Sequence, residues 1–404
     1  MKKEDICDAL NFLSDALIEE TGRLREHPGR PAGRWLRWGA AAACLLLTAA
    51  AGFRLLHPAQ PSPDMPLLSI SEEVSGMGFE GYMAYDISEL INANPWKEAA
   101  RLSSLPVYRN REACDENGPV KKPDFEKMRA LLTDIAGRLG LDESRFSITD
   151  NAPDEKTRQQ ITEKMEMAGD SVPEGYFEPS ALILQAEGIK IEVDGSLTAE
   201  ISFSPALRLP AEYSFHHFSS RQELEQVAQY LSGQYASLIG MQKPQLNITG
   251  GDYNIYLQQG YQLEFFEGAG GALDRLLGYS FKRIAFYCDD EGALFLVRLF
   301  QTDLSEKVGD YPAITAQQAE KLLLEGHYLT SVPCEMPGAA YIKKVELLYP
   351  VRGQEKEFLP YYRFYVELPE EERENGLKTY GAYYVPAIES RYIANMPQRG
   401  GGFH

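Results

Sequence analysis

The first regular pattern in the chain lies at its N-terminus. Ile6, Leu10, Leu13 and Leu17 recur every three or four residues within residues 2–24, with acidic side chains between them. This spacing predicts a short amphipathic helix with one apolar face. Such a helix is marginally stable alone in water, so we expect it to pack against a cytoplasmic protein or a second copy of itself, or else to remain partly frayed. Its acidic polar face disfavours the membrane surface.

A long uncharged apolar segment comes next. It covers Trp38–Phe53, and Leu55 and Leu56 extend it past Arg54. A helix rises about 1.5 Å per residue, so this segment is just long enough to span a hydrocarbon core of about 30 Å. The segment therefore predicts a membrane-spanning helix.

The flanks of the apolar segment predict its orientation. Arginines precede it and an acidic stretch follows it, which by the positive-inside rule keeps the N-terminus in the cytoplasm. We predict a cytoplasmic amphipathic helix and basic flank over residues 1–36 and a transmembrane helix over residues 37–56. The protein is then a single-pass cell-membrane protein whose bulk is extracytoplasmic. The Ala-x-Ala pattern at Ala49–Ala51 leaves a cleaved signal peptide as the alternative.

The rest of the chain alternates helical and strand patterns. A Pro-rich spacer and lead-in covers residues 57–105. Three weak repeats follow at residues 106–212, 213–304 and 305–398, each with a helix and then antiparallel strands. This order predicts an α+β class built from three extracytoplasmic modules.

Capping and turn residues place the individual elements. Ser220 and Thr315 are expected N-caps, and Asp194-Gly195 is expected to be a hairpin turn. The predicted helices cover residues 86–92, 124–139, 221–240 and 316–326. The predicted strands and hairpins cover residues 145–149, 181–203, 245–248, 254–266, 279–301 with a turn at 290–292, 340–351, 360–368 and 379–388.

Charge narrows the range of partners. The chain has 404 residues, 44% of them hydrophobic, and 23 Tyr, which is typical of a β-rich globular protein. Residues 1–57 hold 8 of the 40 Lys and Arg and 7 of the 59 Asp and Glu, which leaves 32 basic and 52 acidic residues beyond them. So acidic an exported region is repelled by nucleic acid and by anionic lipid, and it suits solubility, a basic partner or loose cation binding.

The cysteines do not form a dense disulfide framework. Cys114, Cys288 and Cys334 would lie outside the membrane, where at most one pair can form, and a Cys288–Cys334 bridge is one pairing the sequence leaves open. No zinc-ligand spacing occurs, and we predict neither a metal nor a cofactor.

Several short motifs have a chemical and a structural interpretation, and we favour the structural one for each. His216-His217 would face opposite ways in an extended segment, and His327 with Cys334 lacks the context of a nucleophile and base. Asp289–Glu291 is expected to be a charged hairpin tip rather than a calcium site. Residues 267–271 are Gly-rich, but they lack the Lys-Ser/Thr of a phosphate-binding loop and do not lead from a strand into a convincing phosphate-facing helix, so they are expected to form a flexible loop.

The sequence gives no support for the enzyme classes that are recognised by short sequence motifs. The serine-hydrolase, metalloprotease and penicillin-recognising motifs are absent from the sequence, and we predict that the protein is not an enzyme. Carboxylate catalysis leaves little linear trace, so an envelope enzyme acting on glycan or peptide is one alternative. A purely structural membrane-tethered module is another.

Aromatic residues near the C-terminus are the second set of candidate partner-binding residues. Tyr361, Tyr365 and Tyr383 lie in predicted strands, where alternate side chains face opposite sides of a sheet. About half of such residues should be core, and the rest can form a ligand or peptide-binding face. The first set is the apolar face of the N-terminal helix, Ile6, Leu10, Leu13 and Leu17.

Two parts of the chain resemble known families. Ala340–Val351, Leu359–Val366 and Tyr383–Ala387 are similar to PepSY-like and YycI-like extracytoplasmic modules of Firmicutes membrane proteins, in which a helix packs on an antiparallel sheet. The acidic N-terminal helix, Arg34–Gly39 and the Ala-rich anchor resemble single-pass anti-sigma-factor-like proteins of the same bacteria, without the zinc-binding signature of one such class. These resemblances imply a membrane-tethered regulator of envelope processes.

The sequence therefore predicts a membrane-anchored extracytoplasmic binding and regulatory protein. It is expected to bind an envelope protein or peptide and to signal through its cytoplasmic helix.

Overall fold

The computed structural model describes most of the chain beyond its first 64 residues. The described residues are 65–71, 82–85, 90–113, 123–254, 256–333, 335–353, 355–369 and 377–398. Pro66–His404 forms one compact unit. The predicted cytoplasmic helix and transmembrane segment lie outside the described residues. Within the described ranges, no helix is long and apolar enough to cross a membrane.

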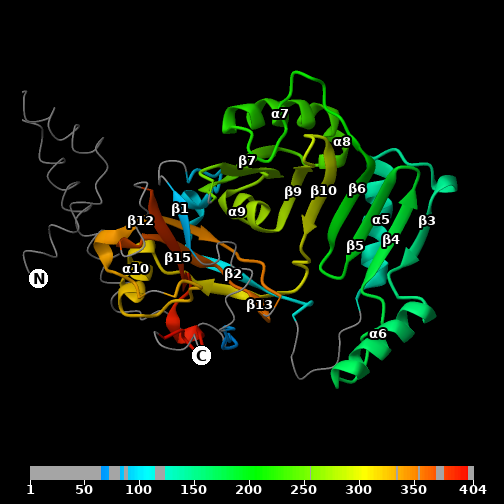
Figure 1. Ribbon diagram of the computed structural model, residues 1–404. Helices are drawn as coiled ribbons and strands as arrows, with labels where there is room; N and C mark the ends of the chain where they lie inside the picture. The colour runs from blue at the N-terminus through cyan, green and yellow to red at the C-terminus, as the bar shows by residue number, and fades with distance from the viewer. Residues whose placement is uncertain are drawn as a thin grey trace, which may run out of the picture. The chain divides into compact units, whose positions relative to one another are not determined.

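Helices alternate with antiparallel strands along the described residues, which confirms the α+β class (Figure 1). The larger sheet has eight strands in the order β3-β4-β5-β6-β10-β9-β8-β7. Every neighbouring pair is antiparallel. The strands are β3 (Ser147–Asp150), β4 (Ala181–Ala186), β5 (Ile189–Asp194), β6 (Thr198–Leu207), β7 (Pro244–Tyr253), β8 (Gln259–Glu267), β9 (Lys282–Cys288) and β10 (Leu294–Gln301).

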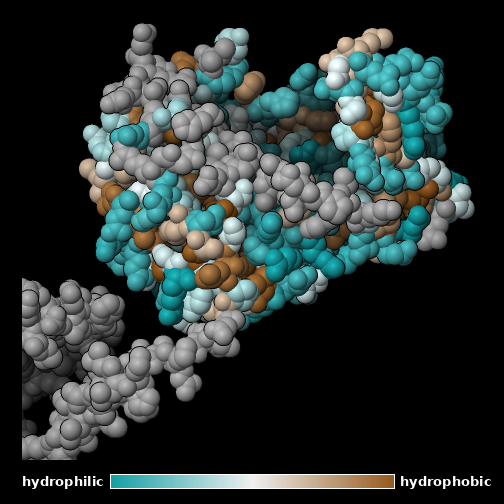
Figure 2. Space-filling view, turned by 90° about the horizontal axis from the view of Figure 1, so that it is seen from below, coloured by the Kyte–Doolittle hydropathy of each residue, from teal (hydrophilic) through white to brown (hydrophobic). Residues whose placement is uncertain are grey.

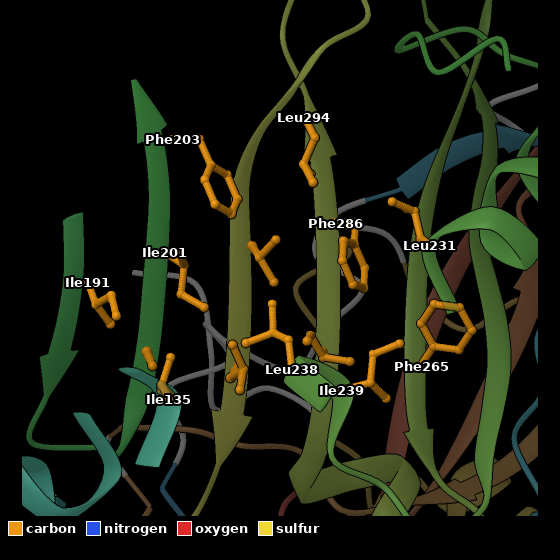
Figure 3. Packing of buried hydrophobic residues seen from close by; sticks show 14 of the residues in the cluster. Ile135, Ile191, Ile201, Phe203, Leu231, Leu238, Ile239, Phe265, Phe286 and Leu294 are labelled. Atoms are coloured by element: carbon orange, nitrogen blue, oxygen red, sulfur yellow. The ribbon is translucent and has the colours of Figure 1, made fainter. Parts of the chain in front are cut away.

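Three helices cover one face of this sheet. Inward-facing residues of the strands alternate with outward ones, so that Ala199, Ile201 and Phe203 of β6 all reach the same core. Figure 3 shows this layer of aliphatic and aromatic side chains between the helices and the strands. Burying one large apolar side chain contributes about 1.5–3 kcal/mol, so this cluster is the main stabilising element of the sheet. The helices are α5 (Phe125–Arg138), α7 (Arg221–Gln234) and α8 (Ala236–Ile239).

The opposite face of the same strands is polar. Glu200 of β6 pairs with Arg298 of β10, and Glu264 of β8 pairs with Arg283 of β9. Helix α9 (Ala272–Phe281) packs on this face, where the ring of Tyr279 meets Phe266 edge-on at 5.2 Å. This polar face is the one that the second part of the molecule approaches.

That second part contains two smaller sheets. The four-stranded sheet has the order β1-β15-β14-β12, and the three-stranded sheet has the order β11-β2-β13. A second hydrophobic cluster joins these sheets to α9 and α10. The elements are β1 (Tyr82–Tyr85), α4 (Trp96–Ala99), β2 (Ser104–Arg109), β11 (Lys307–Pro312), α10 (Ala316–Leu324), β12 (Ile342–Leu348), β13 (Glu357–Phe358), β14 (Tyr361–Glu367) and β15 (Lys378–Pro386). Short 3₁₀ turns occur at Glu143–Arg145, Ala339–Tyr341 and Ser390–Tyr392.

Residues 68–70 are hydrogen-bonded to residues 392–395 near the C-terminal end of the unit. The backbone N–H of Leu68 donates to the carbonyl of Tyr392 at 2.8 Å, and the N–H of Ala394 donates back to Leu68. The Asn395 amide exchanges two hydrogen bonds with Ile70, at 2.8 and 2.7 Å. Part of the predicted spacer and lead-in, residues 68–70, is therefore joined to the C-terminal end of the unit.

The capping predictions are confirmed. Ser220 and Glu223 form a complete capping box at the start of α7, and Thr315 forms one with Gln318 at the start of α10. The turn at Asp194 is also present, because the Asp194 carboxylate accepts hydrogen bonds from the backbone of Ser196 and Thr198.

Several expectations about elements and boundaries differ from the structure. Residues 181–203 form three strands rather than one hairpin, with an extra turn at Gly188. Helix α6 (Glu155–Ala168) was not predicted, because it has no buried residue and thus no apolar stripe. The expected boundary at 212/213 does not separate two sheets, since β6 pairs with β10. Strand β2 crosses the expected start of the first module at residue 106 and pairs with β11 and β13, which belong to the third.

Candidate functional site

A cleft lies between the polar face of the eight-stranded sheet and the four-stranded sheet. Its volume is about 790 Å³, and its walls come from β7, β8 and β9 on one side and from α9, β14 and residues 348–351 on the other. The space-filling view shows the surface hollowed between two raised portions of the described residues, with hydrophilic side chains predominating around the hollow (Figure 2). Ligand pockets in proteins commonly have volumes of about 300–1,000 Å³, so the cleft has the size of a ligand site.

The eight-stranded sheet contributes one buried ion pair to the wall of the cleft. Nη1 of Arg283 donates to both carboxylate oxygens of Glu264, at 3.1 and 3.3 Å. Asn247 of β7 donates to the same carboxylate at 3.2 Å. Glu264 is almost fully buried, and the guanidinium of Arg283 stacks over the ring of Phe300 with 4.7 Å to its centroid. The pair is thus held by neighbouring side chains of the same sheet, Asn247 and Phe300.

The four-stranded sheet contributes a second buried pair. Glu346 of β12 lies directly opposite Arg363 of β14, and Nη2 of Arg363 donates to its carboxylate at 2.7 Å. Lys344 contacts the other carboxylate oxygen at 2.6 Å and Asn92 donates to it at 2.8 Å. Burial favours the neutral form of Glu346, but the charges of Arg363 and Lys344 outweigh burial and hold its pKa at about 2. This carboxylate is therefore ionised at any physiological pH.

One phenol stands close to both pairs. Tyr279, near the end of α9, is half-buried and lines the cleft, and desolvation of its hydroxyl raises its pKa. Tyr279 lines the cleft together with Arg363, Glu264 and Arg283, and the charges of both ion pairs act on its pKa. The two sheets thus bring their charged residues to one place.

A short strap, defined here as residues 90–94, holds the two sheets around the cleft. The Ala93 N–H donates to the Asn247 side chain at 3.0 Å, on the larger sheet. Nζ of Lys344 donates to the Leu90 carbonyl at 2.8 Å, on the smaller sheet. The strap has no regular secondary structure in the described residues, where a helix over residues 86–92 was expected. The polar groups of the strap form hydrogen bonds with side chains of both sheets rather than with one another along a helix.

The rim of the cleft includes three exposed apolar side chains beside polar ones such as His217. Ile91, Phe218 and Val351 line the cleft and remain 52%, 53% and 43% exposed. Exposed large apolar side chains gathered at one opening are typical of interaction sites, whereas single ones are ordinary. The cleft therefore combines a charged floor with a partly apolar rim.

Two further cavities continue from the cleft. One of about 340 Å³ shares Ser280, Arg283 and Val351 with it, and one of about 650 Å³ adjoins that second cavity at Asp303. Burial opposes ionisation of Asp303, but hydrogen bonds from Lys127 and Ser305 lower its pKa to about 2. Arg283 thus stands where the cleft meets the next cavity.

The predicted partner-binding residues have different positions. Tyr365 lines the cleft. Tyr361 is fully buried and donates to Glu355 at 2.8 Å, and Tyr383 lies in the second hydrophobic cluster against Tyr328, so neither lines the cleft. Ile6, Leu10, Leu13 and Leu17 lie outside the described residues.

The weaker motifs mostly have structural roles. His217 lies 3.5 Å from Asp290 on the surface and also lines the cleft. His327 contacts the Pro397 carbonyl through Nδ1 at 3.0 Å. The Asp289 carboxylate accepts backbone N–H groups of its own hairpin tip. Cys334 lies outside the described residues. In the part of the chain that the structure describes, no three side chains of His, Cys, Asp or Glu are grouped as metal ligands.

The Gly-rich segment differs from the prediction. Residues 267–271 connect β8 to α9 rather than forming a flexible loop. The Glu267 carboxylate accepts the N–H groups of Gln242, Lys243 and Ala269, and the Gly271 N–H donates to Asp274 of α9. The segment is fixed by these bonds, and the helix it starts carries Tyr279 to the cleft.

Sequence reasoning missed the residues that line the floor of the cleft. Arg363 in the middle of the apolar run Tyr361–Val366, and Glu264 in Gln262–Phe266, are charged residues within otherwise apolar strands. A charge at such a position is a signal for a buried ion pair, because an unpaired one is too costly to bury.

Comparison of the chain with protein-family models gave no match, and neither did comparison with curated proteins.

Proposed function

We propose that the protein is a membrane-anchored extracytoplasmic binding protein that takes up a ligand in the cleft between its two larger sheets. The observation that carries the proposal is the convergence of two ion-paired arginines, the half-buried Arg283 and the buried Arg363, from different sheets on one cleft whose rim includes apolar side chains. Such a mixture of apolar surface and a few fixed polar groups is typical of ligand sites.

The state of the carboxylates supports binding rather than acid–base chemistry. Glu346 accepts from Arg363, Lys344 and Asn92, and its low pKa leaves it without a proton to donate. Glu264 is engaged by Arg283 and Asn247. A general acid needs a pKa near the working pH.

The anchoring and regulatory parts of the proposal rest on the sequence. The apolar segment at residues 37–56 and its basic flank support a single membrane span with the N-terminus in the cytoplasm. The order of α10 followed by the antiparallel strands β12, β14 and β15 supports a PepSY-like third module. The cytoplasmic helix would then report ligand occupancy to a protein partner.

A variant that fills the cleft tests the proposal. Thr249 lines the cleft on the polar face of β7, and Thr249→Trp should occupy the ligand volume. The control is Gln185→Trp, on an exposed position of β4 away from the cleft. Short peptides, amino acids, sugars and nucleotides are screened by their effect on the melting temperature of the full-length protein.

We expect at least one class to raise the melting temperature of the native protein and the control, but not that of Thr249→Trp. The absence of any shift at millimolar concentrations, or equal shifts in Thr249→Trp, would overturn the proposal.

A further inference from the structure

The floor of the cleft presents hydrogen-bond donors that find no acceptor among the residues that the structure describes. Arg283 binds Glu264 only through Nη1, and its Nε is buried without a hydrogen-bond partner. Stacking on Phe300 fixes the plane of the guanidinium. The edge of Arg283 that carries Nε is therefore oriented in advance and unoccupied.

Arg363 repeats this arrangement from the other sheet. Its side chain is only 9% exposed, its Nη2 is bound to Glu346, and its Nε also has no partner. Its guanidinium lies over the ring of Tyr365, 5.0 Å from the centroid. A buried N–H without an acceptor is costly, and of the four arginines whose Nε has no partner within the described residues only Arg283 and Arg363 line the cleft, where a ligand can supply acceptors.

The acceptor has to be an anion of small charge. Guanidinium groups only donate, and their edges match a planar carboxylate. Arg283 and Arg363 line the cleft, and together with Lys344 behind its lining they pair with two buried carboxylates, which leaves one positive charge. Asp252 also lines the cleft and would repel a polyanion, as would the formal charge of −19 of the whole chain.

The rim indicates what the carboxylate is attached to. Ile91, Phe218 and Val351 offer apolar contact around the opening, and the buried side chain of Asn247 lies deeper on the wall. A peptide that ends in apolar residues has both parts, a single terminal carboxylate and side chains that bury against such a rim.

We infer that the cleft binds the free C-terminus of a peptide with apolar last residues, whose carboxylate is received by the unused donors of Arg283 and Arg363. This inference rests on the proposed function and names its ligand class. The last side chains of the peptide contact Ile91, Phe218 and Val351, and the main chain leaves past Asp252.

The test compares two pentapeptide libraries on the full-length protein. Both end in Leu, Ile, Phe or Val; one has a free carboxylate and the other a C-terminal carboxamide. Bound peptides are identified by affinity-selection mass spectrometry, and the best acid and amide pairs are measured by isothermal titration calorimetry. We expect the acids to bind at least about tenfold more tightly than the amides, because charge-assisted hydrogen bonds are lost with the carboxylate.

Substitutions of single arginines show which side chain causes the preference for peptide acids over amides. Arg283→Gln should abolish the preference for acids, whereas Arg298→Gln should keep it, since Arg298 has a similar cross-strand pair with Glu200 on the same face outside the cleft. Arg283→Lys retains a charge beside Glu264 but lacks Nε. This variant replaces Arg283→Gln in the test if the glutamine variant does not fold. It should also lose the preference.

The outcomes separate the two proposals. Equal binding of acids and amides, or an unchanged preference in the Arg283 variants, overturns the inference. If neither library binds but another ligand class stabilises the protein in the Thr249→Trp comparison, the inference fails and the binding function stands. If no ligand of any class binds, both fail.

Discussion

The buried carboxylate of Glu346 allows a quantitative prediction. Glu346→Gln keeps the size of the side chain and removes its charge, so the variant imitates the protonated glutamate. The carboxylate is 1% exposed and is contacted by Lys344, Arg363 and Asn92. The substitution leaves two cations beside a neutral amide in the floor of the cleft, where water does not compensate for the lost charge.

The size of the effect follows from the pKa. Glu346 has a pKa of about 2, because the charges beside it outweigh its burial. An unfolded glutamate has a pKa of about 4.3, so ionisation stabilises the folded state by about 3 kcal/mol at pH 7. Because the folded pKa is the lower one, this contribution is complete above the unfolded pKa and is lost as the pH falls toward 2. At pH 3 about 1.4 kcal/mol should remain.

Urea unfolding of the full-length native protein and of Glu346→Gln at pH 7 and pH 3 measures both numbers. Glu200→Gln is the control, because Glu200 has a comparable cross-strand pair with Arg298 but is 43% exposed and should contribute at most about 1 kcal/mol. A loss in Glu346→Gln no larger than in the control, or the same loss at both pH values, would refute the reasoning.

Three further predictions concern the fold. Phe286→Ala opens a cavity in the larger core and should lower the free energy of unfolding by about 3–5 kcal/mol in chemical denaturation; a loss below about 1 kcal/mol would contradict the packing. Ser220→Ala removes the capping box with Glu223 and should cost about 1 kcal/mol, against almost nothing for Ser232→Ala later in α7. Burial raises the pKa of Cys288 to about 11, so peptide mapping should find it alkylated at pH 8 only after unfolding; alkylation in the folded protein would exclude this burial.

Local signals in the sequence were sufficient for the elements that have them. The N-caps Ser220 and Thr315 and the turn at Asp194 were predictable, because a side chain that satisfies nearby backbone groups needs no distant partner. Helix α6 was missed because its 14 residues pack no apolar stripe. Helix α9 was missed because its apolar residues run directly into strand β9 and look like one continuous strand.

The candidate site was predictable only in part. Alternation along β14 suggested that some of its aromatic residues face an open side, and Tyr365 does line the cleft. The alternation of side chains along β14 did not show which of its aromatic residues line the cleft. Different parts of the protein cover the two faces of this strand, and both Tyr361 and Tyr362 are buried. The pairing of Glu264 with Arg283 depends on β8 lying beside β9, and the approach of this pair to Arg363 depends on how two sheets meet. Neither arrangement can be predicted from one segment alone.

The way the sheets meet also explains why the cleft persists. The eight-stranded and the four-stranded sheet each pack on a separate hydrophobic cluster. Hydrogen bonds of the strap and ion pairs line the junction between the two sheets. Polar contacts fix geometry but yield little net stability, because each group gives up its water. On the proposed function, a ligand that supplies acceptors to both Arg283 and Arg363 would bridge the sheets. At a concentration one hundred times its dissociation constant it would stabilise the folded state by about 2.7 kcal/mol, nearly what the ionisation of Glu346 contributes.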